Sequence, residues 1–177
     1  MDEVADRVAG LLLDDPPELV VTFGPDGLTR HRYHVQPGEI GTEAFHRARR
    51  RGPPSAFRRL YHVVQRRSAM DAYYGAARRR GLPMGGPDTM MNPVGVPDAS
   101  IAVDVDVIPV YGRKLAAIRR HRSQIDELDR IPSDLQPLHL AHECFVQAWP
   151  EPAGSGHVRS DLFADLAPAA TDLGMIG

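Results

Sequence analysis

Residues 19–34, LVVTFGPDGLTRHRYH, set a short apolar run against a glycine-rich turn and two histidines, His31 and His34. An apolar run of this length that ends in Gly-Pro-Asp-Gly is typical of a buried strand leaving a sheet. In open α/β folds, the loop beyond the carboxyl end of such a strand holds functional residues. We therefore expect the two imidazoles to face a site, with two histidines that only cap a turn as the alternative.

The segments on either side alternate between helical and strand patterns. The spacing of apolar residues predicts helices that end near Asp14 or span about 39–51, 66–81, 109–128 and 135–140. Runs of apolar, β-branched and aromatic residues predict strands over 19–23, 60–64, 101–107 and 142–149, with a Gly- and Pro-rich loop over 82–97. Because helices between strands favour parallel pairing, the expected fold is α/β, with a mostly parallel, Rossmann-like sheet and helices on both faces.

Length and composition fit one globular domain. The chain has 177 residues, 42% of them hydrophobic, and we place the domain at residues 1–150. Residues 151–177 are rich in Gly, Ala and Pro, and we expect a mostly mobile tail with a docking cluster near 162–166. The chain has no apolar run of about eighteen residues, its start is acidic rather than a basic signal peptide, and Cys144 is its single cysteine. These features predict a soluble, cytoplasmic protein with no membrane partner.

Positive charge is concentrated in one part of the chain. Residues 46–80 carry eleven arginines against one acidic residue, Asp71, although the net charge of the whole chain is −2. Such a segment could form a phosphate-binding surface for nucleic acid. Lys114 is the only lysine, however, so a general preference for arginine on solvated helix faces is the favoured interpretation. Nucleic acid is therefore an unlikely partner on the sequence alone.

The two histidines after the first strand also allow a metal site. Side chains three residues apart can meet on one side of a helical turn, and neutral imidazole is a good zinc ligand. Catalytic zinc usually takes three protein ligands plus water. His31 and His34 offer two candidate nitrogens with no adjacent carboxylate, so their spacing alone gives only a weak indication of metal.

Four segments, in order along the chain, resemble motifs of the LmbE-like (PIG-L) zinc-dependent N-deacetylases. Residues 20–34 resemble the signature F-G-P-D-G-x-T-G-H-P-D-H, and residues 114–124 the helix K-x-x-A-x-x-x-H-x-S-Q. Residues 142–145 resemble the E-A-F strand, and residues 161–166 the D-L-F-A-G-L ending. The resemblance extends over most of the chain, from residue 4 to residue 166.

This resemblance implies a hydrolase that removes an acyl group from an N-acylated amino sugar or a related small amide. His34 matches a zinc ligand of the family, so zinc is the expected cofactor. His31 matches the residue that carries a proton toward the developing charge and then to the leaving amine. Asp26 and Thr29 line the turn and are expected near the substrate.

The chain also departs from the family pattern. The family's A-H-P-D-D-E loop supplies two further zinc ligands and the general base, and nothing upstream of Leu19 matches it. We therefore expect a truncated domain whose sheet lacks its first strand, with an exposed edge that an oligomer or a partner chain covers. Family Gly-His-Pro-Asp-His becomes Arg30-His31-Arg32-Tyr33-His34, which places two guanidinium groups beside His31 and disfavours its cationic form.

Three functional hypotheses follow. The first is a deacetylase segment that is inactive alone, because one ligand cannot hold catalytic zinc. The second is a non-catalytic, ligand-binding remnant of the family, and the third, least favoured, is an arginine-patch nucleic-acid binder. His142-Glu143 is the remaining possible ligand pair, but adjacent strand residues point to opposite faces, and we favour that structural interpretation.

Overall fold

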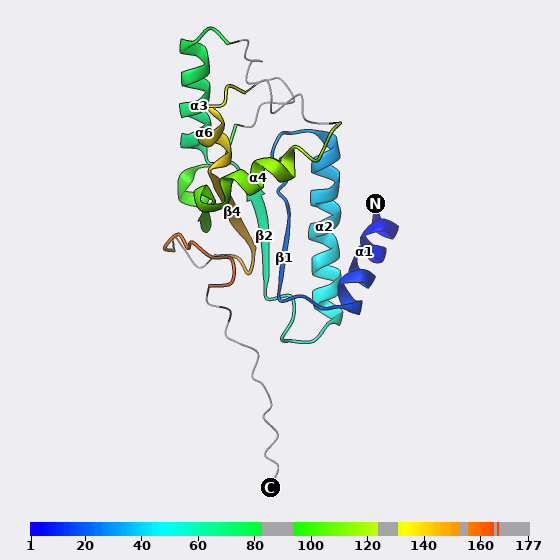
Figure 1. The fold of residues 1–177 in the computed structure, drawn as a ribbon. Helices are drawn as coiled ribbons and strands as arrows, with labels where there is room; N and C mark the ends of the chain where they lie inside the picture. The colour runs from blue at the N-terminus through cyan, green and yellow to red at the C-terminus, as the bar shows by residue number, and fades with distance from the viewer. Residues whose placement is uncertain (83–93, 124–130, 153–155, 165, 167–177) are drawn as a thin grey trace.

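The computed structural model describes residues 1–82, 94–123, 131–152, 156–164 and 166. Its elements are, in chain order, α1 (Asp2–Asp14), β1 (Leu19–Phe23), α2 (Arg32–Arg51), β2 (Arg59–Val64), α3 (Arg67–Arg79), η1 (Asp98–Ser100), β3 (Val103–Asp106), η2 (Ile108–Val110), α4 (Tyr111–Ile118), α6 (Gln136–Leu140) and β4 (His142–Trp149) (Figure 1). The strands lie where the sequence predicts them. The helix predicted over about 109–128 is shorter than expected: α4 ends at Ile118, and residues 119–123 are not helical. Most of the predicted 82–97 loop, residues 124–128 of that predicted helix and residues 167–177 lie outside the described residues.

The four strands form one mixed sheet in the order β1-β2-β4-β3. β1 pairs with β2 in parallel, whereas β4 is antiparallel to both β2 and β3. The α/β class is confirmed, but the expected predominance of parallel pairing is not seen in the described sheet. Asp106 at the end of β3 lies opposite His142 at the start of β4, so the chain between them leaves and re-enters at the same end of the sheet. α4 and α6 occupy this excursion and do not form a crossover, which is why β3 and β4 run antiparallel.

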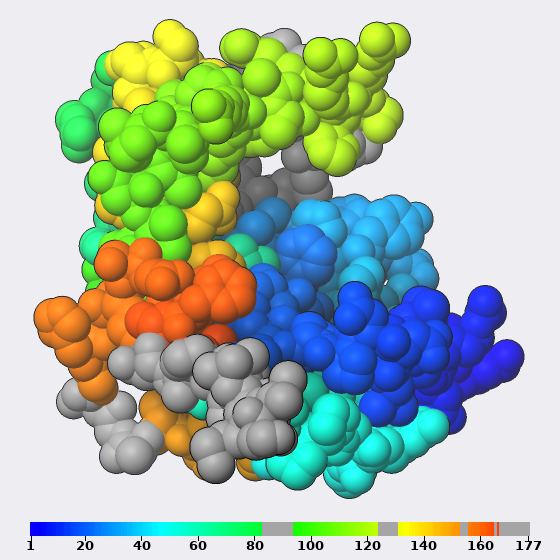
Figure 2. Space-filling model, turned by 60° about the horizontal axis from the view of Figure 1, so that its bottom comes forward, coloured from blue at the N-terminus to red at the C-terminus, as the bar shows by residue number. Residues whose placement is uncertain are grey.

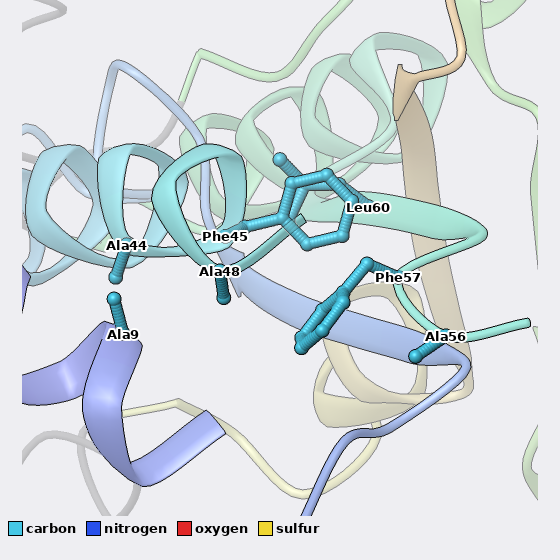
Figure 3. Close-up of a cluster of buried hydrophobic side chains, with 7 residues drawn as sticks. All are labelled: Ala9, Ala44, Phe45, Ala48, Ala56, Phe57 and Leu60. Atoms are coloured by element: carbon cyan, nitrogen blue, oxygen red, sulfur yellow. The ribbon is translucent and has the colours of Figure 1, made fainter. Parts of the chain in front are cut away.

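One face of the sheet packs against α1 and α2. Figure 3 shows the cluster at this interface, where alanines of the two helices face each other beside two phenylalanine rings. The buried members are Ala9, Ala44, Phe45, Ala48, Ala56, Phe57 and Leu60. Small side chains at the helix contact let α1 approach α2 closely. α2 packs on β1 and β2, so this part of the core joins α1 to the sheet mainly through α2.

The other face of the sheet carries a second apolar cluster. Its buried residues are Tyr61, Val103 and Phe145, and Leu162 from beyond β4 packs against them. Arg159 forms an isolated bridge with Val103 and places its guanidinium 5.8 Å from the centre of the Tyr61 ring. Chain segments therefore cover both faces of the sheet. Candidate functional groups are expected at its polar ends.

β1 forms one edge of the described sheet, where Val21 is 43% exposed. The expectation that an oligomer or a partner chain covers this edge stays a prediction. No helix in the described part of the chain has the length and apolar character needed to cross a membrane.

The second helix begins earlier than the sequence predicts, at Arg32 instead of about residue 39. Pro37 lies inside the observed helix, although proline lacks the N–H that a helix interior needs. Gly38 instead allows close packing, since a Cβ there would lie 2.7 Å from the Phe23 carbonyl oxygen. Gly41, one turn on, contacts Thr22 in the same way. Packing of α2 on β1 thus outweighs the local loop signal, and it brings the helix start to the end of β1.

Candidate functional site

The turn between β1 and α2 has a tight, specific backbone. Gly27 N–H donates to the Gly24 carbonyl oxygen over 2.9 Å, and Leu28 N–H donates to Asp26 Oδ1 over 3.1 Å. Gly27, Leu28 and Arg30 all have left-handed φ values, of 57°, 66° and 59°. Non-glycine residues adopt this region at a cost, and such strain concentrates at functional sites. The surrounding structure therefore holds this turn in one conformation.

The turn packs directly against the first turn of α2. A Cβ on Gly27 would lie 2.5 Å from Val35 N and 2.9 Å from His34 Cβ, distances that real side chains do not tolerate. His31 and His34 lie on this helix start, so their positions depend on the glycine turn. The Gly-Pro-Asp-Gly pattern thus fixes the placement of both imidazoles.

His34 is oriented through its Nδ1 atom. Nδ1 lies 3.1 Å from the Gly27 carbonyl oxygen, which can only accept, so Nδ1 carries the proton and donates. Thr29 Oγ1 lies 3.1 Å from the same nitrogen, and the Phe23 ring stacks on the imidazole at 4.6 Å with an interplanar angle of 6°. This arrangement leaves the lone pair on Nε2 available. A backbone carbonyl that holds Nδ1–H is the usual support of a metal-binding histidine.

His31 caps α2. Its Nδ1 accepts from Tyr33 N–H over 3.3 Å, so in this geometry the ring carries its proton on Nε2. The His31 and His34 ring centres are 6.1 Å apart, and the two rings lie at one helix start. His31 therefore has the capping role that the sequence left open as an alternative. The same geometry leaves an Nε2–H that can donate to a ligand.

The two predicted substrate residues use their oxygens within the turn. Asp26 Oδ1 accepts from the backbone, and Thr29 Oγ1 contacts His34. Their placement near substrate stays a prediction, as do the roles of His31 and His34. Sequence reasoning missed His62, which lies opposite Thr22 in the parallel register and whose Nε2 is 3.1 Å from Thr42 Oγ1.

His62 is a half-buried neighbour of this turn. Burial lowers the pKa of its imidazole, and the nearby carboxylate of Asp26 opposes that shift. A Cβ on Gly24 would contact the His62 side chain at 3.4 Å. The available signal was strand alternation, which places Leu60, His62 and Val64 on one face of β2. No acidic residue adjoins His62 in the sequence, so the local pattern does not indicate a ligand there.

A second polar group lies at the same end of the sheet, where β1, β2 and β3 end and β4 begins. Lys114 Nζ of α4 is 2.7 Å from Glu143 Oε1 of β4 and also donates to the Leu140 carbonyl oxygen. This ion pair joins two of the motifs that resemble the deacetylase family. His139 lies nearby, where burial lowers the pKa of its ring to about 4, with the Lys114 charge acting in the same direction.

The residues of the possible ligand pair His142-Glu143 have different partners, as strand alternation predicts. His142 Nδ1 is 2.8 Å from Asp104 Oδ1, whereas Glu143 pairs with Lys114. Asp104 also accepts from Arg66 Nη2 and lies 3.6 Å from Cys144 Sγ. Burial raises the pKa of the Cys144 thiol to about 11, so this cysteine stays protonated near neutral pH. The group is a structural network between β3 and β4.

The donor set does not complete a zinc site. Among the described residues, no group of three or more His, Cys, Asp or Glu side chains could hold a metal ion. His34 has the tautomer of a ligand, but one imidazole is too few for catalytic zinc. A full coordination sphere would need further donors from outside the described part of the chain.

The arginine-rich segment is distributed over several elements. Arg47 contacts Asp2, Asp6 and Glu43, each at 2.7 Å, and thereby ties α1 to α2. Other arginines of the segment also pair with carboxylates, namely Arg58 with Glu18, Arg66 with Asp104 and Arg80 with Asp134. These pairs favour a role in structure over a continuous phosphate-binding surface.

The fold and the turn after β1 define an α/β protein with an imidazole site at one end of its sheet. No family model matches the chain. Several relatives are named 1D-myo-inositol 2-acetamido-2-deoxy-alpha-D-glucopyranoside deacetylase. The one from Mycobacterium sp. (strain KMS) is 34% identical over 176 residues, 94% of this chain and 54% of the relative. The one from Nocardia farcinica is 31% identical over 184 residues, 96% of this chain and 61% of the relative.

A deacetylase of the same name from Kineococcus radiotolerans is 27% identical over 189 residues, which is 96% of this chain and 52% of the relative. The chain spans about half the length of the curated relatives it matches. These relatives are deacetylases that act on an acetylated amino sugar linked to inositol, as their names state.

Proposed function

We propose that this chain is a segment of an LmbE-like N-deacetylase, a hydrolase of N-acylated amino sugars joined to a polyol. The single observation that carries this proposal is the geometry of His34. Its Nδ1–H is held by the Gly27 carbonyl oxygen at 3.1 Å, so Nε2 is free to donate to a metal. Similarity to deacetylases that act on inositol-linked acetylglucosamine supports the substrate class.

The residues of the turn have separate tasks in this proposal. His34 would be one zinc ligand, and zinc in such enzymes polarises the amide carbonyl and activates water. Gly27 and Thr29 hold the His34 ring, and Phe23 stacks on it, so that Nε2 keeps one direction. His31 presents Nε2–H beside it, where a proton can be donated to the leaving amine.

We further propose that the chain alone does not hydrolyse the amide, because its described residues offer one fitting ligand. The purified chain would be incubated with zinc and with 1D-myo-inositol 2-acetamido-2-deoxy-α-D-glucopyranoside, and release of the free amine measured. We expect no amine release and less than one zinc per chain by mass spectrometry. Chelator-sensitive turnover with one zinc per chain would contradict this statement while leaving the deacetylase assignment intact.

The deacetylase assignment itself is tested in a chimaera. The segment of the Mycobacterium relative that aligns with this chain would be replaced by residues 1–177, so that the relative supplies the rest of the protein. We expect zinc-dependent amine release, reduced on the order of 100-fold or more by His34→Gln. His157→Gln, at an exposed position, is the matched control and should keep the activity.

A non-catalytic, ligand-binding function is the second candidate, and the incomplete donor set favours it. In that case the folded, zinc-loaded chimaera would bind the sugar without releasing amine. Binding measured by calorimetry alongside the activity assay separates the two functions. Zinc-dependent amine release that is lost in the His34→Gln chimaera, with sugar binding retained, would support the enzyme.

A further inference from the structure

A cavity of about 380 Å³ lies at the opposite end of the sheet from His31 and His34. It forms where α2 ends, β2 begins and β4 ends, since Leu60 lies opposite Trp149 in the register. Pockets of a few hundred Å³ are the size that holds small organic ligands. In Figure 2 the end of α2 and the start of β2, in cyan, lie at the lower edge of the view, and the orange segment that follows β4 lies to their left. The cavity is thus separate from the proposed deacetylase site.

The lining of this cavity is cationic. Arg49, Arg58 and Arg59 contribute to it, and no carboxylate is among the described residues that line it. The Arg49 guanidinium lies 4.3 Å from the centre of the Trp149 ring, which holds its planar group at the wall through a cation–π contact. A guanidinium fixed in this way loses little rotamer entropy when it binds a ligand.

Arg59 provides a second argument for a ligand. Its Nε is buried and has no hydrogen-bond partner among the described residues, although Nη1 donates to the Arg58 carbonyl oxygen over 3.2 Å. A buried donor without an acceptor costs free energy, and proteins usually satisfy such groups. An oxyanion accepts from guanidinium groups in a bidentate manner, and it would meet this requirement once the Arg59 side chain turns Nε toward the cavity. Arg58 already pairs with Glu18 at 3.4 Å and needs no ligand for its charge.

The rest of the wall is apolar. Pro53, Pro54, Ala56 and Phe57 line it beside the arginines, with Pro150 following the tryptophan. We propose that the cavity binds a small organic anion with an apolar body, which carries a carboxylate or a phosphate ester toward Arg49 and Arg59. The apolar body lies against the proline and phenylalanine surfaces.

A contribution to helix stability does not by itself explain the position of Arg49 at the cavity wall. Basic residues in the last turn of a helix interact favourably with its carbonyl end, and Arg50 and Arg51 share that benefit. Only Arg49 of these three lines the cavity and stacks on Trp149. Arg51 is therefore the matched control, because it lies in the same helical turn but outside the cavity.

Trp149 is the only tryptophan of the chain and reports on the cavity directly. The full chain would be titrated with phenyl phosphate, benzoate and neutral benzyl alcohol, with both tryptophan fluorescence and calorimetry as readouts. We expect saturable binding of the anions, weakened by added salt, and no saturation with benzyl alcohol. The tighter of the two anions identifies the preferred oxyanion.

Variants distinguish anion binding in this cavity from a general effect of positive charge on anion binding. Arg49→Ala should weaken anion binding about tenfold, the effect of losing one charged hydrogen bond. Arg59→Lys keeps the charge but loses the fixed fork, and should also weaken binding, whereas Arg51→Ala should change it less than twofold. Circular dichroism verifies the fold of each variant. Failure of both anions to bind, equal binding of benzyl alcohol, or equal losses in Arg49→Ala and Arg51→Ala would overturn the proposal.

Discussion

Gly27 is the residue on which the geometry of the imidazole site depends. Its φ of 57° is left-handed, and a Cβ there would meet Val35 N at 2.5 Å. We expect Gly27→Ala to lower the free energy of unfolding by about 2 kcal/mol or more, since strain and a backbone clash add. Urea unfolding followed by circular dichroism measures this loss.

Gly10 is the matched control for that change. It lies within α1 and a Cβ there would meet nothing within 4 Å. Gly10→Ala should therefore raise stability by about 0.5–1 kcal/mol, the helix propensity difference. Equal effects of the two substitutions would show that the turn around Gly27 can relax.

The sequence alone predicts the position of the turn and of both histidines. It does not predict the hydrogen bonds that these histidines make. The Gly-Pro-Asp-Gly pattern after an apolar run placed His31 and His34 at the end of β1. The tautomer of His34 depends on the Gly27 carbonyl, whose direction is set by left-handed backbone angles. His62 enters only through the pairing of β1 with β2, a contact between distant segments that local patterns do not encode.

Among the elements, α1 and α2 are held together by small side chains. Ala9, Ala44 and Ala48 are fully buried where the helices meet (Figure 3). We expect Ala44→Leu to lower the free energy of unfolding by about 1–3 kcal/mol, because three added carbons cannot fit without moving α1. Thermal and urea unfolding measure the change. Ala72→Leu, at an exposed position of α3, should stay within about 0.5 kcal/mol, and a similar loss there would contradict the packing argument.

The sequence predicts some element boundaries better than others, and it does not predict the direction of every strand correctly. The last strand, 142–149, was predicted with its observed limits, because Phe145, Val146 and Trp149 favour a strand and Pro150 follows it. The start of α2 was missed, since Gly38 and Gly41 act through contacts with β1 that outweigh Pro37. Strand direction depends on where each connection returns to the sheet, and the long helix predicted over about 109–128 suggested a crossover between β3 and β4 that does not form.

At the scale of the whole molecule, the sheet separates two polar regions. The end where β1 stops holds the imidazoles and the Lys114–Glu143 pair, and the other end holds the arginine-lined cavity. Alternation of apolar and polar residues predicted the buried faces between these regions. It did not predict the cavity, because Arg49, Arg59 and Trp149 come from three separate elements.

We expect the free energy of unfolding to depend on pH because the His139 ring is buried. Burial lowers the pKa of this ring from its ordinary 6.5 to about 4 in the folded chain, so between these values the unfolded chain binds a proton that the folded chain does not. The free energy of unfolding that comes from keeping the His139 ring neutral is complete above about pH 6.5. It declines by about 3 kcal/mol in total as the pH falls toward 4. His46 and His62, whose pKa values burial also lowers, add to the decline in the same direction.

A comparison of variants isolates the His139 contribution. His139→Leu removes the titrating ring and also a buried Nδ1 that has no hydrogen-bond partner among the described residues. Urea unfolding from pH 7.5 to pH 4.5 should show a shallower loss of stability in this variant than in the wild type. His157→Leu, at an exposed position, should leave the wild-type slope unchanged. If all three proteins lose stability in parallel, the His139 ring takes up its proton without unfolding, and the end of the sheet around Lys114 must open to water.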